Sequence, residues 1–79
     1  MSNAIARAER NLAARETSNA RDLAVNALVA LEITEDRPLT PEEFGDIQRR
    51  LTDAKNYLHS AGVRVRRAYR REQKEAKAA

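Results

Sequence analysis

The chain has 79 residues and a formal net charge of +3, and 42% of its residues are hydrophobic. This length allows one small domain, and the absence of cysteine excludes disulfides, thiolate metal sites and cysteine catalysis. Of the 33 hydrophobic residues 15 are alanine and another 15 are Leu, Ile, Val or Phe, which is too few large side chains to enclose a deep active site.

Neither end of the sequence carries an obvious targeting signal. Residues 1–7 lack the apolar stretch of a secretory signal. The longest nearly apolar run, residues 23–31, is far shorter than the roughly 20 residues that span a bilayer. We therefore expect a cytoplasmic protein that makes no contact with a membrane.

The first predicted element is a helix over residues 3–33, which are rich in the strong helix formers Ala, Arg, Glu and Leu. Ser2 or Asn3 provides its N-cap. Polar residues 16–19 interrupt its apolar stripe and leave two interpretations open. One is a continuous helix with a polar layer, which we favour, and the other is a break near 17–19.

The end of this first helix is apolar nearly all round. Residues 23–33 contain only Asn26 and Glu32 as polar members. A helix that is apolar on every side is buried on more than one side, whereas a single partner helix covers only one. The segment therefore predicts a third or fourth helix nearby, most simply from a second copy of the chain.

A short connector, residues 34–39, precedes the clearest helix start in the sequence. Thr40 is a predicted N-cap, Pro41 suits the first helical position, and Glu43 completes a capping box with Thr40. Leu39 and Phe44 have the spacing of a hydrophobic staple. These signals together place the start of the second helix at Pro41.

The second helix, predicted over about residues 41–70, carries apolar residues at alternating spacings of three and four, the heptad pattern of a coiled coil. Gly62 interrupts the pattern, either as a bend or as the helix end. The pattern stops at Glu72, so residues 71–79 are predicted to fray as a basic tail behind a single domain of residues 1–70. The stripe consists of Phe44, Ile47, Leu51, Ala54, Leu58, Ala61, Val65 and Ala68.

These elements predict an all-α fold, an antiparallel helical hairpin that completes a bundle by forming a homodimer or higher homo-oligomer. The residues expected to mediate self-association are the large ones of the heptad stripe and of the apolar segment. They are Phe44, Ile47, Leu51, Leu58, Val65, Leu23, Leu28 and Leu31.

The C-terminal third is the most distinctive charged feature. Residues 54–79 contain eight basic and two acidic side chains. Like charges four residues apart on a helix repel, and an acidic protein or a nucleic acid would relieve this repulsion. The predicted partner-binding residues are Arg64, Arg66, Arg67, Arg70, Arg71, Lys74 and Lys77.

No set of residues points to catalysis, to a metal or to a cofactor. His59 is the only histidine and has no carboxylate at helical spacing, which favours a packing role. The acidic residues Glu42, Glu43 and Asp46 suit the first turns of a helix. We therefore predict a non-enzymatic interaction or adaptor protein without a small-molecule substrate. It self-associates and docks a protein partner through charged helix faces, and nucleic-acid binding through residues 64–77 is the alternative.

Overall fold

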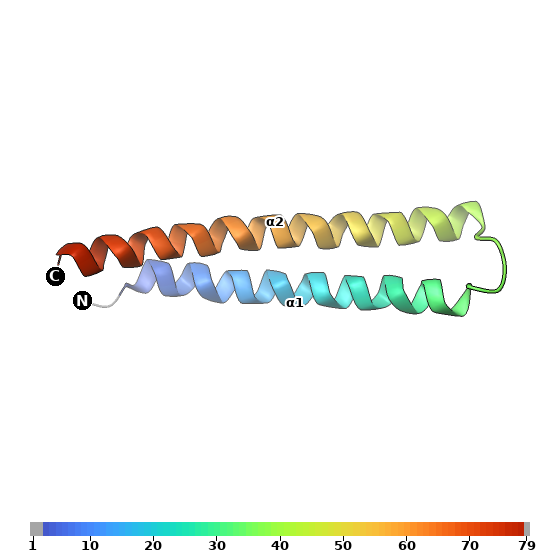
Figure 1. Cartoon of the computed structure of the whole chain (residues 1–79), viewed down its shortest axis with the longest axis horizontal. Helices are drawn as coiled ribbons and strands as arrows, with labels where there is room; N and C mark the ends of the chain where they lie inside the picture. Colours follow the sequence, from blue (N-terminus) through green and yellow to red (C-terminus); the bar gives the residue numbers. More distant parts are fainter. Residues whose placement is uncertain (1–2, 79) are drawn as a thin grey trace.

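Two long helices lie side by side in the computed structural model, which describes residues 3–78 (Figure 1). Helix α1 (Ala4–Ile33) and helix α2 (Pro41–Ala78) run antiparallel and are joined by residues 34–40. The Cα atoms span 61 × 14 × 13 Å, so the chain is a thin rod. The predicted all-α helical hairpin is confirmed. Among the described residues, no helix combines the length and the apolar character needed to cross a membrane.

Helix α1 is continuous, as the favoured interpretation predicts. The side chain of Asn3 accepts a hydrogen bond from the backbone N–H of Ala6 at 3.1 Å and so caps the first turn. The polar residues at 16–19 do not break the helix. Thr17 Oγ1 donates to the carbonyl of Ala13 at 2.8 Å, so its hydroxyl bonds within the helix instead of capping a new one.

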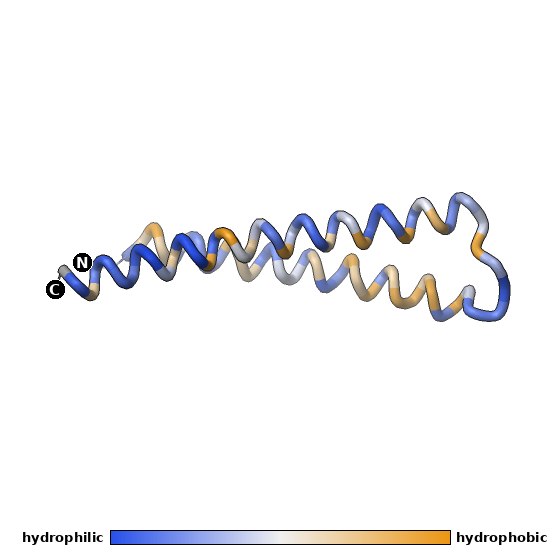
Figure 2. Tube along the Cα trace, turned by 45° about the horizontal axis from the view of Figure 1, so that its top comes forward, coloured by the Kyte–Doolittle hydropathy of each residue, from blue (hydrophilic) through white to orange (hydrophobic). Residues whose placement is uncertain are grey.

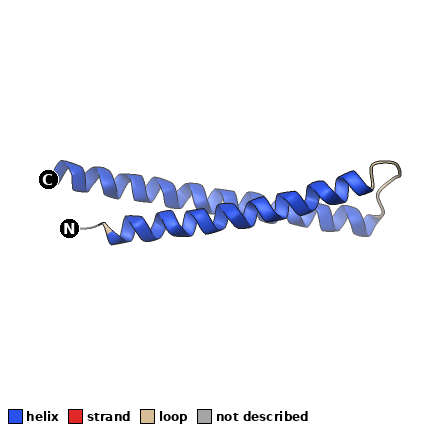
Figure 3. Ribbon diagram, turned by 90° about the horizontal axis from the view of Figure 1, so that it is seen from below, coloured by secondary structure: helices blue, strands red, loops and turns tan. Residues whose placement is uncertain are grey.

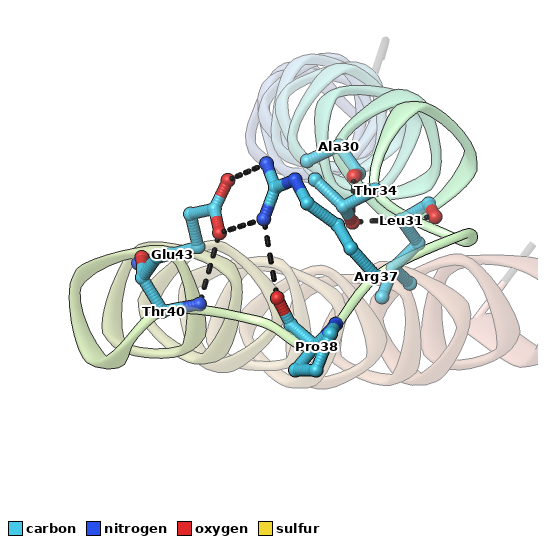
Figure 4. Close-up of polar contacts among 7 residues, drawn as sticks. All are labelled: Ala30, Leu31, Thr34, Arg37, Pro38, Thr40 and Glu43. Atoms are coloured by element: carbon cyan, nitrogen blue, oxygen red, sulfur yellow. Dashed lines mark hydrogen bonds and ion pairs between the residues drawn. The ribbon is translucent and has the colours of Figure 1, made fainter.

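The predicted capping box is present at the start of α2 (Figure 4). The backbone N–H of Glu43 donates to Thr40 Oγ1 at 3.1 Å, and the backbone N–H of Thr40 donates to Glu43 Oε1 at 2.9 Å. Two donors at the helix start are thereby satisfied reciprocally.

An arginine in the connector strengthens this start in a way that the sequence pattern did not indicate. Arg37 donates from Nη1 and Nη2 to the two carboxylate oxygens of Glu43, at 2.8 and 2.7 Å (Figure 4). Its Nη1 also donates to the Pro38 carbonyl at 3.2 Å. The Arg37 guanidinium and then the Thr40 N–H lower the pKa of Glu43 to about 2. The Glu43 carboxylate thus binds both the connector, through Arg37, and the N-cap residue Thr40.

Helix α2 continues past the end predicted at about residue 70 and reaches Ala78. Gly62 lies within the helix and does not end it. The predicted frayed tail is therefore helical through Ala78, and residue 79 lies outside the described residues. Glu72, interpreted as the end of helix packing, instead pairs with Arg10 of α1 at 3.3 Å. This polar pair extends the contact between the two helices beyond the apolar stripe. An apolar pattern alone could not reveal such an extension.

The interface between the helices consists of small residues repeated every seven positions. Its buried members are Ala6, Ala13, Ala20 and Ala27 on α1, and Ile47, Ala54, Ala61 and Ala68 on α2. Thr34 continues the α1 row and is buried at 5% exposure, its hydroxyl donating to the Ala30 carbonyl at 2.7 Å. The helices wind about each other and cross in the view of Figure 3, as a seven-residue repeat requires.

This interface contains only half of the predicted heptad stripe. The row of Ile47, Ala54, Ala61 and Ala68 faces α1. The row of large residues does not, since Phe44, Leu51, Leu58 and Val65 are all between 43% and 54% exposed. The physical reason is that alanine permits a closer approach of the two backbones than a row of leucines would, so the large side chains lie beside the contact line. The α1–α2 interface is therefore an alanine ladder.

Candidate interaction surfaces

One side of the hairpin carries a stripe of large, exposed apolar side chains. On α2 it consists of the exposed row of the predicted heptad stripe, which contains Phe44, Leu51, Leu58 and Val65. On α1, Leu28 and Leu31 lie on the same side, because Ala14 and Thr17, two heptads before them, line the same groove as Val65. We call this surface the apolar face, and its members are Leu28, Leu31, Phe44, Leu51, Leu58 and Val65. Each is at least 43% exposed.

The structure separates the predicted self-association residues into two groups. Six of the eight form the apolar face. Ile47 is only 6% exposed because it packs inside the hairpin, and Leu23 is half-buried on the opposite side of the alanine ladder. Ile47 and Leu23 therefore hold the two helices of one chain together.

The hairpin buries very little of its large apolar side chains. Of the 15 Leu, Ile, Val and Phe residues, Ile47 is the only one that is buried, Leu23 and Val63 are half-buried, and twelve are exposed. Figure 2 shows the greater hydropathy of α1 near the connector and the hydrophilic end of α2. Val25, Val29 and Ile33 are exposed there outside the apolar face, at 49%, 48% and 73%. The segment 23–33 is thus uncovered on several sides in a single chain.

The apolar face becomes hollow toward the chain termini. An open groove of about 610 Å³ lies there between the helices. Its floor includes Ala13 and Ala68, and its walls include Ala14, Thr17, Val65 and Tyr69. The Arg10–Glu72 pair closes its far end. The same side of the molecule is therefore bulky near the connector and hollow near the termini.

Arg64, one of the predicted partner-binding residues, forms ion pairs with α1 within the hairpin. Its Nε donates to Glu16 Oε1 at 2.6 Å, and its Nη1 lies 3.5 Å from Glu9 Oε2. The side chain of Arg64 is 29% exposed, and those of Glu16 and Glu9 are 17% and 19% exposed. Arg64 thus links α2 to two carboxylates of α1 that are one heptad apart.

The environments of Glu16 and Arg64 stabilise the charged forms of these two side chains. The Ser60 hydroxyl and the Arg64 guanidinium lower the pKa of Glu16, although partial burial acts in the opposite direction. Glu16 and then Glu9 raise the pKa of Arg64. Sequence analysis missed Glu9 and Glu16 as partners of Arg64. Their seven-residue spacing, which is that of the helix repeat, was the available signal.

The other six predicted partner-binding residues remain exposed. They lie outside the apolar face, because their positions in the seven-residue repeat differ from that of Val65, and Arg71 shares the repeat position of Arg64. None forms an ion pair with another described residue. We call them the basic strip, and its members are Arg66, Arg67, Arg70, Arg71, Lys74 and Lys77.

Comparison of the chain with protein-family models, with curated proteins and with solved structures gave no significant match.

Proposed function

We propose that this chain is a non-enzymatic interaction protein that self-associates through the apolar face and docks an acidic protein partner through the basic strip. The observation that carries the proposal is the exposure of twelve of the 15 large apolar side chains, six of them gathered on one face. Soluble monomers rarely leave such a contiguous patch uncovered, and patches of this kind mark interaction sites.

The basic strip supports the docking half of the proposal. Six exposed cations, none of them paired with another described residue, repel one another along one helix, and an acidic surface relieves that repulsion. Four of the six are arginines, whose planar guanidinium binds a carboxylate through two parallel hydrogen bonds.

Sedimentation across a concentration series tests self-association. The unmodified chain is expected to sediment as an oligomer at micromolar concentration, and Leu51→Glu with Leu58→Glu is expected to sediment as a helical monomer. Val29→Glu with Ile33→Glu is the matched control, because these residues are exposed outside the apolar face. A folded monomer at all concentrations, or equal effects of both double variants, would overturn the assignment.

Nucleic-acid binding is the second candidate, and the free guanidinium groups of the basic strip favour it. Binding of labelled duplex DNA, single-stranded DNA and RNA is then expected to weaken steeply as salt rises, by about 0.9 log units per phosphate contact per log unit of salt for the duplex. Arg67→Glu with Arg71→Glu is expected to abolish it, whereas the charge-matched control Arg7→Glu with Arg15→Glu retains most of it. Failure of all three ligands at low salt rules this candidate out.

A further inference from the structure

We infer that the apolar face is covered by a second copy of the chain turned end over end, so that the connector end of each hairpin lies on the terminal end of the other. This inference rests on the proposed self-association and adds the orientation and register of the two copies. The result is a four-helix bundle in which every helix is antiparallel to its neighbours. Charge, shape and one glycine support this arrangement.

The charges of the hairpin are polarised along its long axis. The connector half, residues 21–60, has five basic and eight acidic side chains, a net charge of −3. The terminal half, residues 1–20 and 61–79, has ten basic and four acidic side chains, a net charge of +6. An end-over-end dimer places each positive half on a negative half. Two copies with their connectors together would instead bring both positive halves side by side, and like charges at an interface are unfavourable.

The shape of the apolar face is complementary to itself only in the same orientation. Its bulky side chains, including Leu28, Leu31 and Phe44, lie near the connector, whereas the groove of about 610 Å³ lies near the termini. Turned end over end, the bulky half of each copy fills the hollow half of the other. With both connectors at one end, bulky side chains oppose bulky side chains and the two grooves remain empty, which loses packing contacts.

The register follows from the mid-point of α2. A two-fold axis near Leu58, close to the middle of the helix, overlaps the two rods almost completely. Leu51 then lies opposite Val65 of the second copy, and Lys55 lies within one residue of the level of its Gly62. Leu28 and Leu31 reach the level of Thr17 and Ala14, which line the groove.

Gly62 has no role within a single hairpin that explains its presence in the middle of a helix. It is exposed, and a Cβ atom at this position would meet nothing within 4 Å. Glycine in a helix interior is destabilising relative to alanine. The proposed register supplies a reason, because the absent side chain leaves room for the aliphatic stem of Lys55 from the second copy.

Spin labels on introduced cysteines test the orientation, and the native chain offers a cysteine-free background. Gly45→Cys and Gln73→Cys suit this purpose because both residues are exposed and lie in one row of the seven-residue repeat, away from the apolar face. The two positions are separated by about 28 residues, or about 42 Å of helix at ~1.5 Å per residue.

In the end-over-end dimer, each labelled variant alone is expected to give an intermolecular distance of about 40 Å. Mixing the two variants adds a distance shorter than about 25 Å, because residue 45 of one copy lies near residue 73 of the other. Short distances in each variant alone, without a short one specific to the mixture, would overturn the orientation. A monomer in sedimentation would instead overturn the proposed self-association itself.

A second pair of variants tests the register. Gly62→Leu is expected to weaken self-association by at least about tenfold, because the added side chain occupies the space assigned to Lys55 of the second copy. The matched control, Gly45→Leu, introduces the same side chain at a helix position that also has open space around it and is expected to leave association unchanged. Retention of full association by Gly62→Leu would contradict the register.

Discussion

Arg64 Nε and Glu16 Oε1 lie 2.6 Å apart and join the middle of α2 to the middle of α1. Glu9, one heptad before Glu16, lies on the other side of the same guanidinium. The alanine ladder that holds the helices together is nearly uniform along its length, so this cluster is one of the features that distinguish one register of the helices from another.

Arg64→Ala is expected to lower the thermal unfolding midpoint, because two partly buried carboxylates lose their cation. Arg67→Ala, three residues later on the exposed surface, is expected to change it little. Circular dichroism melting of both variants makes the comparison. A double-mutant cycle with Glu16→Gln then isolates the pair, and a zero coupling energy would contradict the assigned role.

Ala20→Leu is expected to destabilise the hairpin by about 1–3 kcal/mol, because a large side chain in the alanine ladder forces the two backbones apart. Ala20 is 2% exposed. Ala8→Leu supplies the control, since Ala8 is exposed on the same helix. Urea denaturation gives both free energies of unfolding. Equal values for the two variants would show that the ladder is not the tight contact described above.

Gly45→Ala is expected to stabilise α2 by about 0.5–1 kcal/mol, because alanine reduces the entropy lost on helix formation. The new methyl group meets nothing within 4 Å, so no steric cost offsets the gain. The shift of the urea midpoint at an unchanged slope measures it. A decrease in stability would indicate a contact at this position that the isolated hairpin lacks.

Acidification is expected to weaken the start of α2. Arg37 and Thr40 lower the pKa of Glu43 from its ordinary value of 4.5 to about 2. A carboxyl with a depressed pKa in the folded state contributes stability that is present above about pH 4.5 and is lost as the pH falls toward 2.

Glu43→Gln should therefore flatten the dependence of stability on pH in this window, as measured by urea denaturation between pH 2 and 7. Arg37→Ala should return the pKa of Glu43 toward its usual value in a carbon-detected NMR titration. An unchanged titration midpoint in that variant would rule out Arg37 as the main cause.

Local signals in the sequence predicted the beginning of α2 correctly, because Thr40 and Glu43 satisfy each other within four residues. The position of the connector, residues 34–39, was predicted as well, because it directly precedes this helix start. The role of Arg37 was not, because its bond to Glu43 depends on how the connector folds back, which no short spacing encodes.

The heptad pattern predicted two rows of α2 that contact other helices, but not which of the two rows faces α1. The rows of Phe44 and Glu43 are both neighbours of the Ile47 row, and a repeat of seven does not distinguish them. Hydrophobicity favoured the row of large residues, whereas the hairpin uses the row containing Glu43 and Arg64. The ion pairs of Arg64 with Glu9 and Glu16 become apparent only when the residues of both helices are considered together.

The alanine ladder makes the length of the rod modular. The buried positions of both helices repeat every seven residues, so removal of one seven-residue block from both helices at the same level shortens the molecule by about 10 Å and keeps the remaining buried positions in register. Such a molecule grows or shrinks in units of one heptad pair, and the distance between its two ends is set by the number of rungs.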